Sequence, residues 1–227
     1  MKKFATKIID LKADANRWGW RRVLLSRIAR VTGRFIGLHI HIVRANAMVD
    51  NPVYPSTLAG ITYRMIHKNE LWAVSSDSQL HLSQNFLQAA TKRGDIAFGA
   101  FDGSVLVSYV WRSFGATPHK KNLWVKVDKP YCYSYNSYTR PEYRGRRISP
   151  GVHLCSDVGM LKHGFKYRAG FVEISNWASL AMSSHMGSHY VGYAGFAKWF
   201  GRYFPFRTGA VKKIGFEFLR SVSSYTE

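Results

Sequence analysis

The sequence holds little cysteine: only Cys132 and Cys155 occur among its 227 residues. Two cysteines exclude a disulfide scaffold and a cysteine-based metal site. Both fall in segments predicted to form the core, which favours buried free thiols and a reducing cytoplasm. No apolar run approaches the ~20 residues of a membrane-spanning helix. The basic start has no continuous apolar stretch with a cleavage site, so we expect no secretory signal and a cytoplasmic protein.

Acidic residues are also scarce. Asp and Glu total 13 against 33 Lys and Arg, which gives a net charge of +20. Such an imbalance implies an anionic partner, whether nucleic acid, a membrane surface, an acidic carrier protein or a phosphorylated ligand. Hydrophobic residues make up 46% of the chain, so global disorder is excluded. The length suits one sizeable domain with an appendage.

Much of the positive charge lies in residues 1–44, which carry eleven Lys or Arg and two Asp. Apolar residues recur there at helical spacing: Trp20, Leu24, Ile28, Val31 and Phe35. Arginines and a serine occupy the opposite side, at 22, 26, 30 and 34. One interpretation packs the apolar stripe on the main domain. The other lays residues 17–36 on an anionic membrane surface, which makes the protein peripheral.

Residues 35–43 alternate like a strand, with His39 and His41 on one face. Two histidines at this spacing can share a metal, but no carboxylate or third histidine accompanies them, so we expect a structural role and no metal. A loop with Pro52 and Pro55 follows. We therefore divide the chain into a basic amphipathic extension, residues 1–58, and a main domain, residues 59–227.

From residue 59 onward the pattern becomes regular. Alternating apolar residues and turn signals predict strands at 61–67, 95–101, 105–112, 123–127, 131–139, 169–175, 190–204 and 212–220. Helical spacing predicts helices at 69–76, 79–92, 151–164 and 177–186. Residues 114–121 are predicted to be a polar loop.

The chain is organised around the turn between the strand at 131–139 and the helix at 151–164. Ser149 is predicted to cap this helix, with Pro150 in its first turn. The first N–H groups of a helix lack internal partners and attract anions, and Arg144, Arg146 and Arg147 add three cations. A phosphate or pyrophosphate fits such a turn. A solvated, arginine-rich corner is the alternative.

Residues 141–149 (PEYRGRRIS) resemble the acyl-CoA-binding motif of the Gcn5-related N-acetyltransferase (GNAT) superfamily, Pro-x-x-Arg/Gln-Gly-x-Gly-x-Gly/Ala. Arg144 and Gly145 match, whereas Arg147 and Ser149 stand where small residues are usual. The resemblance implies that acetyl-CoA or another acyl-CoA is bound through the residues Tyr138, Thr139, Arg144, Gly145, Arg146, Arg147, Ile148 and Ser149. The order of predicted elements is also similar to that of the family. It implies an α/β (α+β) fold with a mixed, mostly antiparallel central sheet flanked by helices.

A second segment resembles the same family. Asn176 and Ser179 match its Asn-x-x-Ala/Ser pattern beside the pantetheine arm, and Gly187 matches the glycine that ends the helix. An ordinary helix cap is the alternative for Asn176. The family often has a tyrosine as general acid where this chain has Ser183.

The residues for proton transfer are therefore open. We consider Ser183 and Tyr190 as partners of the leaving thiolate, with His185 and His189 nearby, and Glu173 as the base that deprotonates the amine.

Three functions follow from these observations. The first is an acyltransferase in which an amine attacks the thioester of an acyl-CoA directly. Within this class, the charge and the many aromatics also allow a long acyl chain delivered by acyl carrier protein. The second is a nucleic-acid-binding protein, less favoured because no known binding motif occurs. The third is a protein of this fold that binds CoA or a lipid without turnover.

Overall fold

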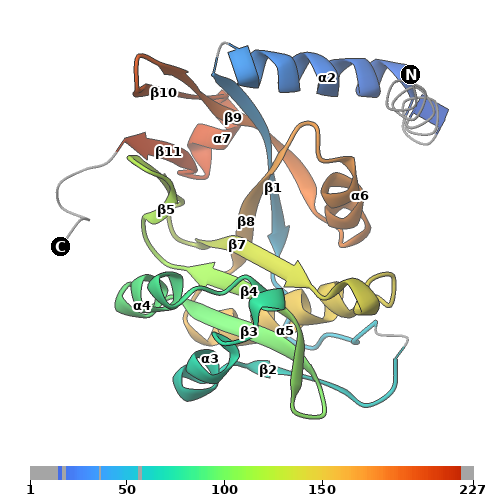
Figure 1. Cartoon of the computed structure of the whole chain (residues 1–227). Helices are drawn as coiled ribbons and strands as arrows, with labels where there is room; N and C mark the ends of the chain where they lie inside the picture. Colours follow the sequence, from blue (N-terminus) through green and yellow to red (C-terminus); the bar gives the residue numbers. More distant parts are fainter. Residues whose placement is uncertain (1–14, 17–18, 36, 56–57, 221–227) are drawn as a thin grey trace.

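The computed structural model describes residues 15–16, 19–35, 37–55 and 58–220, without the side chains at positions 22, 25, 26, 29, 30 and 34. Two sheets dominate this part of the chain (Figure 1). The larger has the strand order β10-β9-β1-β8-β7-β4-β3-β2. Its strands are β1 (Leu38–Ala47), β2 (Ile61–Met65), β3 (Ile96–Asp102), β4 (Val105–Ser113), β7 (Tyr131–Thr139), β8 (Tyr167–Glu173), β9 (His189–Trp199) and β10 (Arg202–Arg207).

Every pairing in this sheet is antiparallel except that of β7 with β8, which is parallel. The predicted mixed, mostly antiparallel sheet is therefore confirmed. The parallel pair follows from the connection: β7 leads through a turn and the helix α5 (Ile148–Lys162) back to β8.

Helices cover both faces of the β2–β3–β4 region. Ile148, Val152 and Met160 of α5 pack with Phe98 and Val110 on one face. On the other face, Leu71 of α3 (Lys68–Val74) and Leu87 of α4 (Gln84–Lys92) pack with Tyr109 and Trp111. Since neighbouring residues of a strand point to opposite faces, β3 and β4 each contribute to both clusters. The core lies on both sides of the sheet.

The helix predicted at 79–92 is two elements. A 3-10 turn η1 (Ser78–Leu80) comes first, capped by Asp77, whose carboxylate accepts from the Gln79 N–H at 2.9 Å. The helix α4 then begins at Gln84, because the Ser83 hydroxyl caps it by accepting from the Phe86 N–H at 3.2 Å.

The second sheet has three strands in the order β11-β6-β5. They are β5 (Thr117–Lys120), β6 (Leu123–Lys126) and β11 (Glu217–Arg220), with the short helix α7 (Gly209–Lys213) before β11. The predicted loop at 114–121 and the single strands predicted at 190–204 and 212–220 are thus wrong in detail. Phe216 and Phe218 join this sheet to the larger one by packing with Phe196 and Val43.

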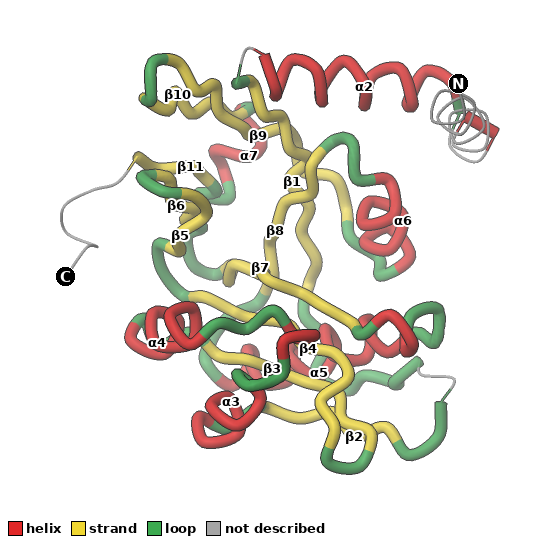
Figure 2. The backbone as a smooth tube through the Cα atoms, in the orientation of Figure 1, coloured by secondary structure: helices red, strands yellow, loops and turns green. Residues whose placement is uncertain are grey.

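The strand β1 lies inside the larger sheet, between β8 and β9 (Figure 2). It pairs with β8 from His41 to Ala47 and with β9 from Leu38 to Ala45. This strand comes from the segment that we assigned to the N-terminal extension, residues 1–58. Residues 38–47 are integral to the sheet, and a separate extension stays a proposal only for the residues before them.

The helix α2 (Trp20–Phe35) leads into β1. Its predicted apolar stripe faces solvent: the exposed fractions are 58% for Trp20, 61% for Leu24, 50% for Ile28, 54% for Val31 and 79% for Phe35. The interpretation in which the stripe packs on the main domain is therefore wrong. No helix in the described part of the chain is long and apolar enough to span a membrane.

Candidate functional site

The strands β7 and β8 are neighbours in the sheet but pair over only three residues each. The parallel pairing joins Tyr131–Tyr133 to Tyr167–Ala169. The strands then separate, and Figure 2 shows β8 running toward α6 (Trp177–His185) while β7 runs toward the start of α5. Beyond Tyr133, the edge of β7 that faces β8 has no strand partner in the described sheet. Its backbone N–H and C=O groups can therefore bond an extended ligand.

A β-bulge lies in this separated part of β7. Tyr135 pairs with Trp111 and Tyr138 with Tyr109 of β4, so the register shifts between them. Asn136 has a φ of +45°, in the left-handed region that asparagine tolerates better than most residues. Bulges of this kind re-aim backbone groups and are frequent beside active sites.

Two adjoining cavities occupy the space between the strands. The inner cavity, about 270 Å³, is lined by Ser134–Ser137 of β7, Arg168–Glu173 of β8, Arg44 and Asn46 of β1, His153 of α5 and Ser183 of α6, among others. The outer cavity, about 1120 Å³, is lined by Tyr138, Thr139, Arg144, Gly145, Arg147, Ile148 and Ser149, among others. The two share Ser137, Arg168, Ser179, Met182 and Met186, so they form one continuous cleft.

The cleft collects nearly all the predicted cofactor residues. Seven of them line the outer cavity alone, Asn176 lines the inner one alone and Ser179 lines both. Arg146 lies in the same turn but lines neither cavity; its guanidinium lies 6.0 Å from the ring centre of Tyr143. Their roles in binding stay predictions.

The turn before α5 is built by two residues in left-handed backbone. Gly145 has a φ of +77° and Arg147 a φ of +56°. Arg147, not Ser149, is the N-cap residue, and the helix begins at the buried Ile148. The predicted cap was therefore wrong by two residues. The turn ends at Arg147 in a left-handed conformation, which glycine adopts more readily than other residues.

The outer end of β7 is held in place by hydrogen bonds. The Ser108 hydroxyl donates to the Tyr138 carbonyl at 2.8 Å and lies 2.8 Å from the Thr139 hydroxyl. The Arg144 Nε donates to the Thr139 carbonyl at 3.1 Å. The guanidinium of Arg144 is thereby fixed at the mouth of the outer cavity, where a positive charge attracts a phosphate.

On α6, Asn176 is the N-cap residue, and its side-chain oxygen accepts from the Ser179 N–H at 3.1 Å. Ser183 lies two turns further and lines the inner cavity. Its hydroxyl donates to the Leu180 carbonyl at 3.0 Å. The hydroxyl can still accept a hydrogen bond from a ligand, because a donating hydroxyl keeps its lone pairs.

The other two predicted catalytic residues lie differently. Glu173 lines the inner cavity. It pairs with His41, and its side chain lies on the same face of the sheet as Phe171. Burial lowers the pKa of Lys120, and the carboxylate of Glu173 offsets part of this lowering. Tyr190 pairs with Arg44, is 53% exposed and lines neither cavity. Burial and Tyr193 raise the pKa of Tyr190.

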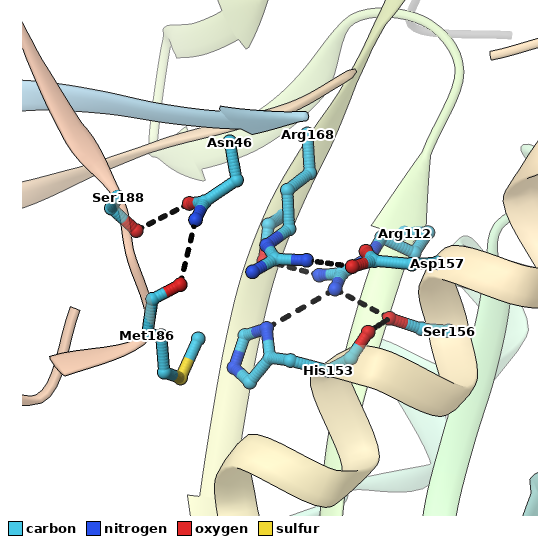
Figure 3. A network of polar contacts seen from close by, with 9 residues as sticks. Asn46, Arg112, His153, Ser156, Asp157, Arg168, Met186 and Ser188 are labelled. Carbon is cyan, nitrogen blue, oxygen red and sulfur yellow. Dashed lines mark hydrogen bonds and ion pairs between the residues drawn. The ribbon is translucent and has the colours of Figure 1, made fainter. Parts of the chain in front are cut away.

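The inner wall also contains polar residues that sequence reasoning missed, among them Arg44, Asn46, His153 and Arg168. Figure 3 shows Asn46 donating to the Met186 carbonyl at 2.9 Å and accepting from the Ser188 hydroxyl. These bonds fix the loop after α6 to β1. Arg168 was detectable as a charged residue at the start of an apolar strand, a position that usually marks a buried partner.

A third histidine, His119 of β5, lies beside His41, and the sequence did not indicate this proximity. Its ring centre lies 6.2 Å from that of His41. Burial, foremost, lowers the pKa of His41 to about 3 and that of His119 to about 4. Both are packed among aromatic rings, Phe171 and Phe218 included. No group of three or more potential metal ligands occurs in the part of the chain that the structure describes.

No protein-family model matches the sequence, and no curated protein matches it as a relative. Solved structures do resemble its fold. A protein assigned to the GNAT family of acetyltransferases from Novosphingobium aromaticivorans is 13% identical, with a TM-score of 0.45 over 82% of this chain and 66% of its own. A GCN5-related N-acetyltransferase from Sphaerobacter thermophilus is 13% identical, with a TM-score of 0.47 over 85% of this chain and 55% of its own.

A third structure, of a protein assigned as an acetyltransferase from Salmonella typhimurium, was solved with its cofactor acetyl-CoA. It is 15% identical, with a TM-score of 0.40 over 72% of this chain and 95% of its own. The chain thus spans less than two thirds of the length of the Novosphingobium and Sphaerobacter proteins. All three of these structures are described as acetyltransferases, and all three have low identity to this chain. Any function of this chain therefore rests on the geometry of its own cleft.

Proposed function

We propose that this chain is a divergent member of the GNAT superfamily and transfers an acyl group, acetyl by default, from acyl-CoA to an amine. One observation carries the proposal: the parallel strands β7 and β8 separate after three residue pairs, and the cleft between them leads to the arginine-bearing turn before α5. An extended thiol arm needs unpaired strand backbone, and a pyrophosphate needs cations with free amide donors. The cleft supplies both, one after the other along its length.

The outer cavity would hold the pyrophosphate end of the donor. Arg144 and Arg147 line it together with the first turn of α5, whose N–H groups have no partner within the helix. Pantetheine would follow the unpaired edge of β7 toward the bulge at Asn136, which brings the thioester to the inner cavity. A volume of about 1120 Å³ is ample, because ligand pockets commonly measure roughly 300–1,000 Å³.

The reaction would rest mainly on positioning. The amine nitrogen attacks the thioester carbon, the carbon–sulfur bond breaks, and the thiolate takes up a proton that the amine loses. Ser183 would hydrogen-bond the thiolate from the inner wall after its hydroxyl proton turns away from the Leu180 carbonyl, because a thiolate can only accept. Glu173 would act as base for an amine that approaches from the face of Phe171 and Lys120. Tyr190 could serve only after a movement toward the cleft.

The experiment is a titration with acetyl-CoA and CoA, read by calorimetry and by thermal unfolding. A ligand at ~100 times its dissociation constant stabilises the folded state by about 2.7 kcal/mol. The variant Arg144→Glu should bind about ten-fold or more weakly, because charge-assisted hydrogen bonds contribute roughly 1.5–3 kcal/mol. Lys166→Glu is the matched control, since Lys166 is exposed and precedes the opposite end of β8.

Equal affinity of Arg144→Glu and the unaltered chain would place the pyrophosphate elsewhere. Absence of any shift with CoA, acetyl-CoA or longer acyl-CoAs, in folded protein, would refute the donor site. An acyl carrier protein added in the same series tests the other donor, and salt-dependent binding of mixed oligonucleotides tests the nucleic-acid alternative. Both of these rest on composition, namely the net charge and the many aromatic residues.

We also propose that α2 places the protein on an anionic membrane surface, as the sequence suggested for residues 17–36. The exposed stripe supports this, and a second apolar group lies beside it. The Lys198 N–H donates to the Gly37 carbonyl at 2.9 Å, which joins the end of α2 to the turn between β9 and β10. Trp199 and Phe200 in that turn are 68% and 92% exposed, with exposed Lys198 and Arg202 around them.

Charge complementarity selects the occupant. The helix α2 contains five arginines and no acidic residue, and each cation near an anionic leaflet contributes about 1 kcal/mol. A triple variant with Leu24, Ile28 and Val31 changed to Gln should sediment less with phosphatidylserine vesicles than the unaltered chain. The control changes Met65 and Val105 to Gln, since both are exposed apolar residues on strands far from α2 (Figure 1). Equal sedimentation of all three proteins would exclude the membrane surface.

A further inference from the structure

A buried polar network, drawn in Figure 3, adjoins the inner cavity, because its residues His153 and Arg168 line that cavity. Its centre is Arg112 of β4, which is fully buried. The guanidinium lies 3.1 Å from His153 Nδ1 and donates to the Ser156 hydroxyl at 2.5 Å and to the Ser134 hydroxyl. All three partners are neutral groups, so this cation has no direct ion pair among them.

The network holds one carboxylate, that of Asp157. It is fully buried and forms an ion pair with Arg168, whose side chain is 6% exposed. Burial lowers the pKa of Arg112 to about 10, which leaves it charged at neutral pH. His153 is neutral there, because burial, Arg112 and Arg168 hold its pKa well below the usual value. Two cations and one anion leave the network with a surplus of one positive charge.

A buried charge without a counter-ion costs several kcal/mol. The surplus therefore calls for an anion close to the network. The nearest open space is the inner cavity, because Ser134, His153 and Arg168 form part of its wall. A negative group in that cavity would lie against these three side chains of the network.

The wall also presents donors that lack acceptors. A guanidinium nitrogen can only donate, so His153 accepts at Nδ1 and carries its proton at Nε2. This Nε2–H is buried and has no hydrogen-bond partner, and His153 is 7% exposed. Arg44, on the same wall, has a buried Nε–H without a partner, while its Nη2 donates to the Ser188 carbonyl.

Two carboxylates of the chain, those of Asp157 and Glu173, are candidates for neutralising this wall. Asp157 keeps one oxygen, Oδ1, without a partner, but its other oxygen holds Arg168. Glu173 belongs to the lining, yet paired residues share a face and Glu173 pairs with His41, whereas Arg44 pairs with Gly170 on the other face. Glu173 therefore does not neutralise the wall formed by Arg44, His153 and Arg168.

We propose that the inner cavity binds a carboxylate carried by one of the two substrates of the proposed reaction. The proposal rests on the acyltransferase function, since it takes the cavity as the place where donor and acceptor meet. The carboxylate accepts from His153 Nε2–H and the Arg44 guanidinium, and it supplies the counter-charge that the network lacks. A cavity of about 270 Å³ has the volume of about nine waters, which suits a short acyl chain or a small amino acid.

The carboxylate has two possible sources, and the hydrogen-bond donors of the wall would bind either of them in the same way. It belongs either to a dicarboxylic acyl group on the donor or to an amino-acid acceptor. For the donor, calorimetry compares succinyl-CoA with butyryl-CoA, which have acyl chains of equal length and differ in the terminal carboxylate. For the acceptor, thermal unfolding in the presence of CoA compares amino acids with their amides.

A preference of at least ten-fold for succinyl-CoA assigns the carboxylate to the donor. Stabilisation by amino acids, and not by their amides, assigns it to the acceptor. In either case Arg44→Gln should abolish the preference and Arg44→Lys should restore part of it. The ligand comparison on the unaltered chain stands even where a variant fails to fold.

Equal binding of each matched pair, with the CoA esters bound, overturns the carboxylate site and leaves the proposed function intact. Binding of free succinate or amino acids without binding of any CoA ester overturns the acyltransferase instead. Binding of neither class overturns both.

Discussion

The ion pair between Asp157 and Arg168 gives the sharpest test of the network under the cleft. Both side chains are almost fully buried, and Arg112 adds a second cation to the same network. Changing Asp157 to Asn keeps the shape but removes the only carboxylate of the network. Loss of one partner of a buried pair costs about 3–5 kcal/mol, because the other charge stays buried. Domains have a total stability of only about 5–15 kcal/mol.

Urea unfolding at pH 7 measures this cost, provided that the slope of free energy against urea is unchanged. The double variant Asp157→Asn with Arg168→Met should cost less than the sum of the two single changes, because it removes both charges. Glu70→Gln is the control, because it breaks an ion pair with Arg64 at the surface. The side chain of Glu70 is 34% exposed and that of Arg64 is 41% exposed, so the change should cost at most about 1 kcal/mol. A loss below about 1 kcal/mol for Asp157→Asn would refute the buried surplus of charge.

Two further predictions concern the turn and the histidines. In urea unfolding, Gly145→Ala should destabilise the protein by about 1–2 kcal/mol, because φ at this position is +77°. No atom lies within 4 Å of the added carbon, so the cost comes from the backbone alone. Gly115→Ala is the control: its site is equally open but has no positive φ, and the change should be near neutral. Stability should fall as the pH drops from about 6.5 toward 4, by up to about 1.4 kcal/mol per pH unit for each buried histidine. The sign follows because the unfolded state binds protons at pH values where His41 and His119, with pKa near 3 and 4, do not. His41→Phe should reduce this slope, and an unchanged slope would contradict the assignment.

Local chemistry made the centre of the site predictable. The alternation of Tyr131–Thr139, the glycine in the turn and the helical spacing after it all act over a few residues. The sequence therefore predicted strand, turn and helix in the right order, with an error of two residues at the cap because the left-handed φ of Arg147 is not encoded by residue type. Asn176 caps its helix, which was the alternative interpretation of that residue.

Long-range pairing could not be predicted in the same way. The register that places β1 between β8 and β9 joins residues more than 100 positions apart, and periodicity does not carry it. The charged network has the same origin, since Arg112, Asp157 and Arg168 come from three elements. In sequence Arg112 and Asp157 resemble solvated charges, and the position of Arg168 indicates burial without indicating its partner. The exposure of the apolar stripe on α2 could not be predicted either. Helical spacing shows that the stripe exists but not whether it packs on the domain or faces solvent.

The position of β1 has a consequence for how the chain is made. Its two neighbours in the sheet come from the last third of the sequence, so β1 leaves the ribosome long before either partner exists. Until β8 and β9 arrive, both of its edges are unpaired, and such edges invite pairing with other chains. We infer that synthesis leaves a waiting period in which this strand needs protection. A chain that lacked residues 38–47 would expose β8 and β9 to the same hazard for its whole lifetime.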